Sequence, residues 1–294
     1  WADGKTKVCT LTGCTYTGTV SGKNADGSVA EPLDYDGYVG RGYTLANCAG
    51  SKVIIDGVEH VQVSNNVYGF YIVNDIYEIA TPAALKWLAD EVNNGRNNFA
   101  GQTVTLLADI DLNNEEWTPI GNSSNPFKGT FDGNNHTISD LVVDGGSSSN
   151  QGLFGYTTDG EIKNLTINNA KVLGRLNVGV VAGTPYTSKY TNIKVTGHVE
   201  VKGMAYVGGV AGYLNKGITE FKNITNLGCG ELLGAGNGQE YRVGGISGAI
   251  NSESDNLVNG SKDDASKGCI YICSGEPKSD NIYLAGIAYS TGGY

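Results

Sequence analysis

Two aspartates in one short, strand-like run are the residues best placed to do chemistry. Asp109 and Asp111 alternate with apolar residues at positions 108, 110 and 112, so in an extended strand both carboxylates point to the same face. Two carboxylates about 7 Å apart suit a Ca²⁺ site or acid–base catalysis. A solvated strand face is the plainer explanation. The sequence therefore names no catalytic residue, and Ca²⁺ is the one cofactor that it suggests.

Tyrosine is the second chemically useful residue type, with 17 copies in the chain. A tyrosine ring offers a large contact area at a low entropic cost, which suits binding of a sugar or a protein. The alternative is that these rings stack along the fold or cover its edges. The candidate ligand-binding residues lie near the ends of short apolar runs and are Tyr156, Tyr186, Tyr190 and Tyr213.

Histidine and cysteine do not form a recognisable site. His60, His136 and His198 are isolated from one another, and no cysteine spacing matches a zinc motif or a nucleophile with its base. The six cysteines leave two possibilities open. They form disulfides, for example between residues 9 or 14 and residue 48, or they are buried free thiols.

The composition excludes several classes of protein. Glycine accounts for 44 of the 294 residues, roughly twice the average usage of about 7%, which is typical of many short strands joined by tight turns. A net charge of −10 argues against nucleic acid or an anionic membrane as the partner. No run of 18 apolar residues occurs, so we expect no membrane insertion within this chain.

A glycine-rich pattern recurs through the second half of the chain. GLFGY, VGVVAG, VGGVAG, VGGISG and LAGIAY place an apolar residue at positions 153, 181, 210, 246 and 287. Periods of this size indicate a solenoid whose turns bury their apolar sides against one another. Three β-branched runs in a unit of about 28 residues predict a parallel β-helix, because a propeller blade needs about 40 residues. In the two longer units we expect inserted loops at residues 228–239 and 251–268.

The VGGVAG pattern leaves its own geometry open. Its two valines are three residues apart, so one flat strand cannot turn both to the same side. Either the strand bends at the middle glycine, or both of its faces are covered.

One helix is expected, just before the repeats. Thr81 is a good N-cap, Pro82 occupies the first helical position and Gly95 is a stop signal. Leu85, Leu88, Ala89 and Val92 form one apolar stripe. An amphipathic helix in this place predicts a cap over the open end of the solenoid core.

The order of the motifs resembles a known family. After the helix come LLADIDLN, WTPIG, FKGTFDGNNHTI, GLFGY, IKNLTI and VGGVAG. Over roughly residues 76–250 this order resembles the GLUG-repeat proteins, found in large bacterial surface proteins and in some IgA1-protease-type metallopeptidases. The resemblance implies a right-handed parallel β-helix and a cell-surface or secreted setting, commonly adhesin-like. It implies no activity, and the zinc-peptidase signature His-Glu-x-x-His is absent from the sequence.

These observations predict an all-β chain in three parts. Residues 1–75 are a β-rich N-terminal segment, residues 76–116 hold the capping helix and the first strand, and residues 117–294 are the GLUG-like repeats. The favoured function is a non-enzymatic bacterial adhesin, or its stalk, that presents a β-helix face and loops to a host glycan or extracellular protein.

The alternative function is a polysaccharide lyase or hydrolase on the same fold. It rests on fold analogy and needs charged residues aligned on successive turns. We expect Lys163, Lys194 and Lys222 to stack in register on the isoleucine–lysine strands. Such a lysine ladder also protects a β-surface from aggregation.

Overall fold

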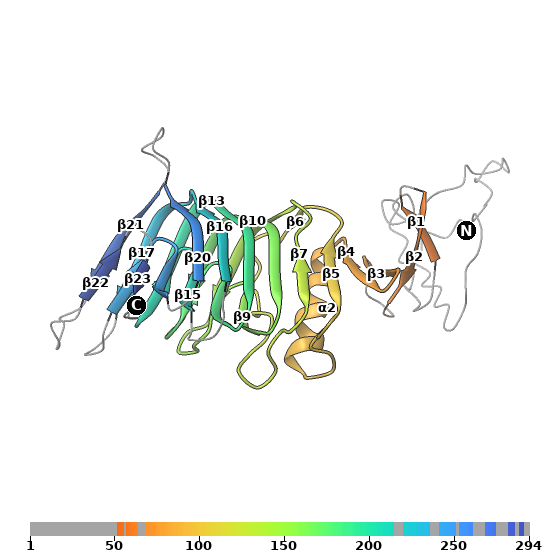
Figure 1. The fold of residues 1–294 in the computed structure, drawn as a ribbon, viewed down its shortest axis with the longest axis horizontal. Helices are drawn as coiled ribbons and strands as arrows, with labels where there is room; N and C mark the ends of the chain where they lie inside the picture. Colours follow the sequence, from red (N-terminus) through yellow and green to blue (C-terminus); the bar gives the residue numbers. More distant parts are fainter. Residues whose placement is uncertain are drawn as a thin grey trace, which may run out of the picture.

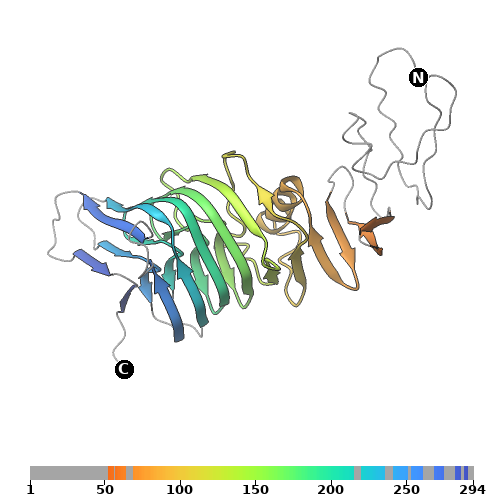
Figure 2. The same cartoon turned by 90° about the horizontal axis from the view of Figure 1, so that it is seen from above.

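In the part of the chain that the structure describes, the fold is a β-solenoid with one helix near the N-terminal end of the repeats (Figure 1). The computed structural model describes residues 52–55, 57–63, 69–214, 220–235, 241–250, 253–260, 268–274, 282–285 and 288–290. Strands of successive turns lie side by side from β5 to the C-terminal end (Figure 2). The expected all-β parallel solenoid and the amphipathic helix before its repeats are confirmed.

A long, 14-stranded sheet runs the whole length of the described fold. Its first four strands pair antiparallel, and from β4 onward the pairing is parallel. The strands of this long sheet are β1 Lys52–Ile55, β2 Val58–Gln62, β3 Phe70–Val73, β4 Ile76–Ile79, β5 Thr103–Leu106, β6 Ile110–Asp111, β7 Thr130–Asp132, β8 Thr137–Asp144, β10 Glu161–Leu173, β13 Lys189–Gly203, β16 Glu220–Asn226, β17 Cys229–Ala235, β20 Glu253–Asn259 and β21 Gly268–Ser274.

Two shorter parallel sheets complete each turn of the solenoid. The second sheet contains β9 Phe154–Thr158, β12 Ala182–Tyr186, β15 Ala211–Leu214, β19 Ser247–Ile250 and β23 Ala288–Ser290. The third sheet contains β11 Val178–Gly179, β14 Tyr206–Gly208, β18 Tyr241–Gly244 and β22 Ile282–Ala285. Three runs per repeat thus become three sheets around one core, as the repeat length predicted.

The core consists of apolar side chains stacked in register from turn to turn. Phe131, Ile162, Tyr190 and Phe221 are neighbours in one such row of the long sheet, and all four are fully buried. Alternation along each strand turns every second residue inward and leaves the next on the outer face. The outer face of the long sheet is therefore polar.

The glycine-rich repeat bends at its middle, which answers the question that the sequence left open. β14 ends at Gly208 and β15 begins at Ala211, so Val207 lies in the third sheet and Val210 lies in the bend before the second sheet, and both are buried. A Cβ on Gly208 would lie 1.9 Å from the carbonyl oxygen of Ala211. The repeat needs glycine because two sheet backbones meet there without room for a side chain.

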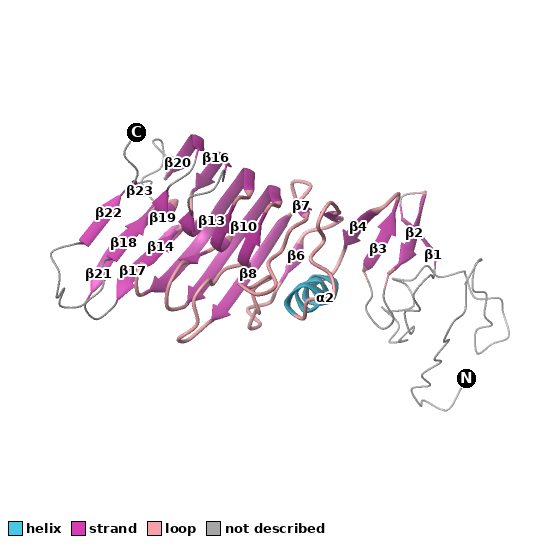
Figure 3. Cartoon of the chain, turned by 60° about the horizontal axis from the view of Figure 1, so that its bottom comes forward, coloured by secondary structure: helices cyan, strands magenta, loops and turns pink. Residues whose placement is uncertain are grey.

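The helix α2 (Pro82–Asn93) forms where the capping signals predicted it (Figure 3). The Oγ1 of Thr81 accepts a hydrogen bond from the backbone N–H of Ala84 at 3.2 Å. Its apolar stripe, which includes Leu85 and Leu88, is buried in the same core cluster as the repeats. The helix thus covers part of the apolar core at the N-terminal end of the repeats. The long sheet continues past the helix from β4 to β1.

A ladder of asparagines, which we did not predict, runs along one corner of the long sheet. Each Nδ2 donates to the Oδ1 of the residue one turn before, at 2.9–3.0 Å. All four asparagines have a positive φ of 51–56°, a conformation that asparagine adopts more readily than other non-glycine residues. The ladder comprises Asp132, Asn164, Asn192, Asn223 and Asn256.

Replacing Asn192 by alanine is expected to lower the free energy of unfolding by about 2 kcal/mol. The change removes two exposed side-chain hydrogen bonds and forces alanine into a left-handed conformation that costs about 1 kcal/mol or more. Asn192→Gly removes the same hydrogen bonds without the backbone strain, so we expect roughly half of that loss. Urea denaturation of both variants measures the difference. Equal losses would contradict the assignment of strain to this corner.

The segments predicted as inserted loops contain regular strands instead, which is a correction. β17 lies within residues 228–239, and β20 lies within residues 251–268. Both strands pair in register with their neighbours in the long sheet. β17 contains two glycines and exposes Glu231, and β20 is mostly polar and exposes Asp255, so their composition is that of a loop although they form strands.

The N-terminal third is only partly described. Residues 1–51, which include the cysteines at positions 9, 14 and 48, lie outside the described residues. The described part of residues 1–75 is β-rich, and β3 pairs with β4 across the expected boundary at residue 75. Cys229 is exposed and free.

Candidate binding groove

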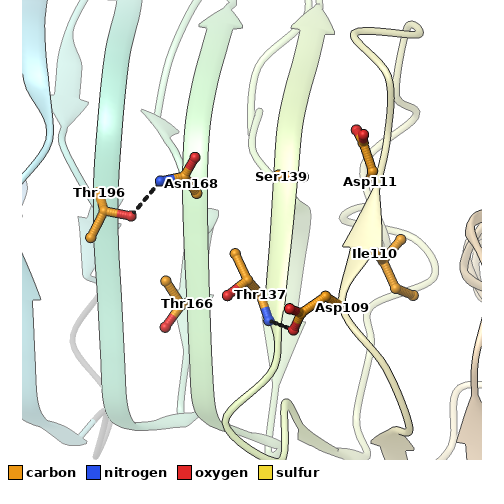
Figure 4. Close-up of a pocket in the computed structure, with 8 residues that line it drawn as sticks. All are labelled: Asp109, Ile110, Asp111, Thr137, Ser139, Thr166, Asn168 and Thr196. Carbon is orange, nitrogen blue, oxygen red and sulfur yellow. Dashed lines mark hydrogen bonds between the residues drawn. The ribbon is translucent and has the colours of Figure 1, made fainter.

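An open groove of about 380 Å³ lies on the outer face of the long sheet (Figure 4). It crosses β6, β8, β10 and β13, four strands from four successive turns. The groove contains both predicted aspartates. Its lining residues are Asp109, Ile110, Asp111, Thr137, Ser139, Thr166, Asn168 and Thr196.

Strand register arranges the polar side chains of the groove in two rows. The first row has one residue on each of the four strands, and each residue is paired with the next across the sheet. It consists of Asp111, Ser139, Asn168 and Thr196. Figure 4 shows these four residues at one level across the strands. The same alternation that buries the apolar residues between the rows brings these polar groups to the outer face.

The second row begins at Asp109 and continues through Thr137 and Thr166. The backbone N–H of Thr137 donates to Asp109 Oδ1 at 2.8 Å, and Thr166 is paired with Thr137 in the sheet. Figure 4 places these three residues at the other level of the groove. The two rows together offer carboxylate, hydroxyl and amide groups, which both donate and accept hydrogen bonds.

Asp109 is held as an exposed carboxylate. Its side chain is 74% exposed, and His136 Nδ1 lies 3.2 Å from Oδ1. The backbone hydrogen bond from Thr137, followed by the contact with His136, lowers the pKa of Asp109 below its usual value. A general acid needs a raised pKa to hold its proton near neutral pH, so this aspartate is poorly suited to that role.

The groove offers few ligands to a metal ion. Across the described residues, no group of three or more His, Cys, Asp or Glu side chains is placed to hold one. Asp111 Oδ1 already accepts the backbone N–H of Asn113 at 2.7 Å. Ca²⁺ requires six to eight oxygen ligands. We therefore derive no role for Ca²⁺ at Asp109 and Asp111.

The far end of the groove is organised by side-chain hydrogen bonds. Asn168 Nδ2 donates to Thr196 Oγ1 at 2.9 Å (Figure 4). Thr196 Oγ1 lies 3.4 Å from the carbonyl oxygen of Ile167, to which it donates. These contacts orient both side chains and use the Nδ2 of Asn168, whereas its Oδ1 is a hydrogen-bond acceptor.

Tyr190 is buried, which corrects its prediction as a ligand-binding residue. Its exposed fraction is 0%, its hydroxyl lies 2.8 Å from Thr157 Oγ1, and its ring stacks on Phe221 with centroids 4.9 Å apart. Burial raises the pKa of Tyr190. The ring faces the core because it continues the row of Ile162.

The other three predicted tyrosines lie on the second sheet and do not line the groove. The rings of Tyr156 and Tyr186 are 6.4 Å apart, and Tyr213 lies 4.7 Å from Tyr206. All are half-buried. Partial burial and then the neighbouring Tyr186 raise the pKa of Tyr156. Neighbouring rings in contact fit the alternative that tyrosines stack along the solenoid.

The three predicted lysines do not form one ladder, which is a further correction. Lys163 and Lys222 occupy one row with Thr191 between them, whereas Lys194 lies in the row of Thr166. Lys163 Nζ is 3.2 Å from Glu161 Oε2. The aligned lysine face required by the lyase or hydrolase alternative is therefore not formed by these residues.

Sequence reasoning found the two aspartates of the groove but missed its other polar residues. The missing signal was the polar–apolar–polar triplet that recurs as TIS at 137–139, TIN at 166–168 and KVT at 194–196. Aligning these triplets, rather than the isoleucine–lysine pairs, would have placed Thr166 and Asn168 beside Thr137 and Ser139.

Comparisons with known proteins give a limited likeness. No family model matches the sequence. A protein named halomucin from Haloquadratum walsbyi is 36% identical over 165 residues, which are 51% of this chain. The chain spans only 2% of the length of that relative. Among the described residues, no helix is long and apolar enough to cross a membrane.

One solved structure also resembles the chain. It is a crystal structure of a Bacteroides ovatus protein assigned as an immunoglobulin A1 protease, with a TM-score of 0.39 and 15% identity. The match covers 73% of this chain and 84% of that structure. At this TM-score the likeness carries no conclusion about activity. The mostly parallel solenoid is established by the strand pairing itself.

Proposed function

We propose that this chain is part of a non-enzymatic, cell-surface or secreted adhesin that binds a glycan in the groove of the long sheet. One observation carries the proposal: two rows of carboxylate, hydroxyl and amide groups lie in one open groove over four neighbouring strands. A sugar presents hydroxyls that donate and accept hydrogen bonds, and these groups match both roles.

The solenoid scaffold supports a binding role. Sites built on paired strands hold their side chains more precisely than sites on loops. Each residue of the first row lies on a strand that is paired on both sides or packed against the core. The groove is thus formed before a ligand arrives, which reduces the entropy cost of binding.

The setting outside the cell is supported by similarity. The relative is named a halomucin, a name that classes it with the mucins, which are extracellular proteins. The resemblance to GLUG-repeat proteins implies the same setting. The partner remains a host glycan or an extracellular protein that carries one, and the adhesin role rests on the groove.

A polysaccharide-cleaving enzyme is less well supported by the groove. Cleavage by paired carboxylates needs one group that holds its proton, whereas Asp109 is exposed and its pKa is lowered. The enzyme alternative is nevertheless an outcome that the experiment below detects.

The test measures retention and cleavage together. The protein is incubated with immobilised host glycoproteins and with bacterial and plant polysaccharides, and new reducing ends are measured in the same wells. We expect retention on at least one glycan and no new reducing ends. The double variant Ser139→Ala/Thr166→Val removes one hydroxyl from each row, and we expect it to weaken retention at least tenfold.

The matched control is Thr225→Val, a threonine of β16 that lies beyond Lys194 in the row of Thr166 and outside the groove. It should leave retention unchanged, because Thr225 does not line the groove. The fold should also be preserved, since surface substitutions of this kind usually alter stability by less than about 0.5 kcal/mol. Release of reducing ends would overturn the adhesin proposal. Retention that survives enzymatic removal of the glycan, or that ignores the double variant, would overturn the groove as the binding site.

A further inference from the structure

The first row of the groove repeats once per turn of the solenoid. Asp111, Ser139, Asn168 and Thr196 come from four successive turns and are paired residue to residue across β6, β8, β10 and β13. Adjacent strands of a sheet are about 4.8 Å apart. The row therefore places one polar group every 4.8 Å or so along the solenoid axis, over about 14 Å in all.

An extended glycan has a matching repeat. When both glycosidic bonds of each sugar ring are equatorial, as in β-1,4-linked glucose or mannose, the chain is nearly straight. Each sugar residue then advances the chain by roughly the distance between two adjacent strands, about 4.8 Å. A glycan lying along the axis can present one residue to each turn, whereas a chain of axially linked sugars curls away from a straight row.

The charge of the groove limits which extended glycans fit. Asp109 and Asp111 place two exposed carboxylates at one end of the groove, and none of its eight lining residues is basic. A uronic acid at that end would bring a third carboxylate within a few ångströms of these two, and no lysine or arginine lines the groove to offset it. Neutral sugars avoid this repulsion and still bond to carboxylate oxygens.

We infer that the groove binds a neutral, equatorially linked polysaccharide in extended form, with its chain along the solenoid axis and one sugar residue over each of four turns. This inference rests on the proposed glycan-binding function and names its ligand class and its direction. The second row, Asp109, Thr137 and Thr166, contacts the other edge of the same chain.

Chain length is the first readout. β-1,4-linked oligomers of glucose, mannose and N-acetylglucosamine, from two to six residues, are titrated by calorimetry against the full chain. For at least one of these sugars we expect affinity to rise at least tenfold from the disaccharide to the tetrasaccharide and to level off beyond it. Maltohexaose, which curls, should bind at least tenfold more weakly than the matching glucose hexamer.

Charge is the second readout. The β-1,4-linked mannuronate hexamer has the linkage and ring configuration of the mannose hexamer and carries a carboxylate in place of each C6 hydroxymethyl group. We expect it to bind at least tenfold more weakly than the best neutral hexamer. Equal or stronger binding of the mannuronate hexamer would overturn the charge argument.

Two variants at opposite ends of the row report the direction of the chain. Asp111→Asn and Thr196→Val should each weaken binding of the hexamer at least fivefold, while Thr225→Val does not. A glycan lying parallel to the strands would contact only one end of the row, so sensitivity to one variant alone would overturn the axial direction.

Failure of this inference differs from failure of the proposed function. If the groove retains a glycan that Ser139→Ala/Thr166→Val releases, yet no extended neutral oligomer binds or chain length has no effect, the axial inference is wrong and the adhesin proposal stands. If no retained glycan responds to that double variant, the proposed function itself is wrong.

Discussion

Replacing Gly212 by alanine is expected to lower the midpoint of thermal unfolding by roughly 10 °C. Gly212 ends a VGGVAG repeat, and a Cβ on it would lie 2.4 Å from the carbonyl carbon of Asn177 and from the backbone nitrogen of Val178. Both are backbone atoms of the preceding turn, so neither can move aside cheaply. Overpacking of this kind costs about 3 kcal/mol, which corresponds to about 6–12 °C in a chain of this size.

Gly101→Ala is the matched control for this prediction. It makes the same chemical change in open space, since nothing lies within 4 Å of the added Cβ, although Gly101 has a φ of +72°. We expect the free energy of unfolding to fall by only about 1–2 kcal/mol, because alanine is strained in this left-handed backbone conformation. Differential scanning calorimetry and limited proteolysis compare the two variants. A Gly212 variant as stable as the Gly101 variant would contradict the close approach of the second and third sheets.

Replacing Asn226 by leucine is expected to cost about 3 kcal/mol of unfolding free energy, although leucine has a similar volume. Asn226 is 0% exposed. Its Nδ2 donates to the carbonyl oxygen of Gly245 at 2.7 Å, and its Oδ1 accepts the backbone N–H of Gly228 at 3.0 Å. Leucine satisfies neither group, and each buried backbone group left without a partner costs about 1–3 kcal/mol.

The exposed ladder residue provides the comparison for Asn226. Asn192→Gly also removes two amide hydrogen bonds, but water replaces them, so its loss should be about a third of that of Asn226→Leu. Urea denaturation of the two variants tests this ratio. Similar losses at the two positions would show that burial of the Asn226 amide does not determine its contribution.

These two predictions concern groups outside the groove, because Gly212 is not in the long sheet and Asn226, although it ends β16 of that sheet, has a buried amide. Gly212 lies in the second sheet, and the Asn226 amide reaches the carbonyl group of Gly245 at the bend that follows β18. The groove lies on the outer face of the long sheet. Groove variants can therefore change binding without changing stability, whereas the glycine and asparagine variants act on the scaffold.

The sequence by itself determined the architecture and the helix. Repeat spacing near 28 residues left room for three short strands per turn, and the structure has three sheets. Thr81, Pro82 and the apolar stripe defined the helix because capping and amphipathic spacing are local properties. The face of Asp109 and Asp111 was likewise readable, since alternation along one strand needs no knowledge of its neighbours.

Only the tertiary structure determined which residues of successive turns are paired with one another. In sequence, Ile193 seemed to correspond to Ile162, but strand pairing places Tyr190 opposite Ile162. This shift of three residues sends Tyr190 into the core and takes Lys194 out of the predicted lysine ladder. Register between turns is set by the packing of the whole core and not by any one strand. The same register created the groove, because Thr137, Ser139, Thr166, Asn168 and Thr196 become neighbours only when four turns are stacked.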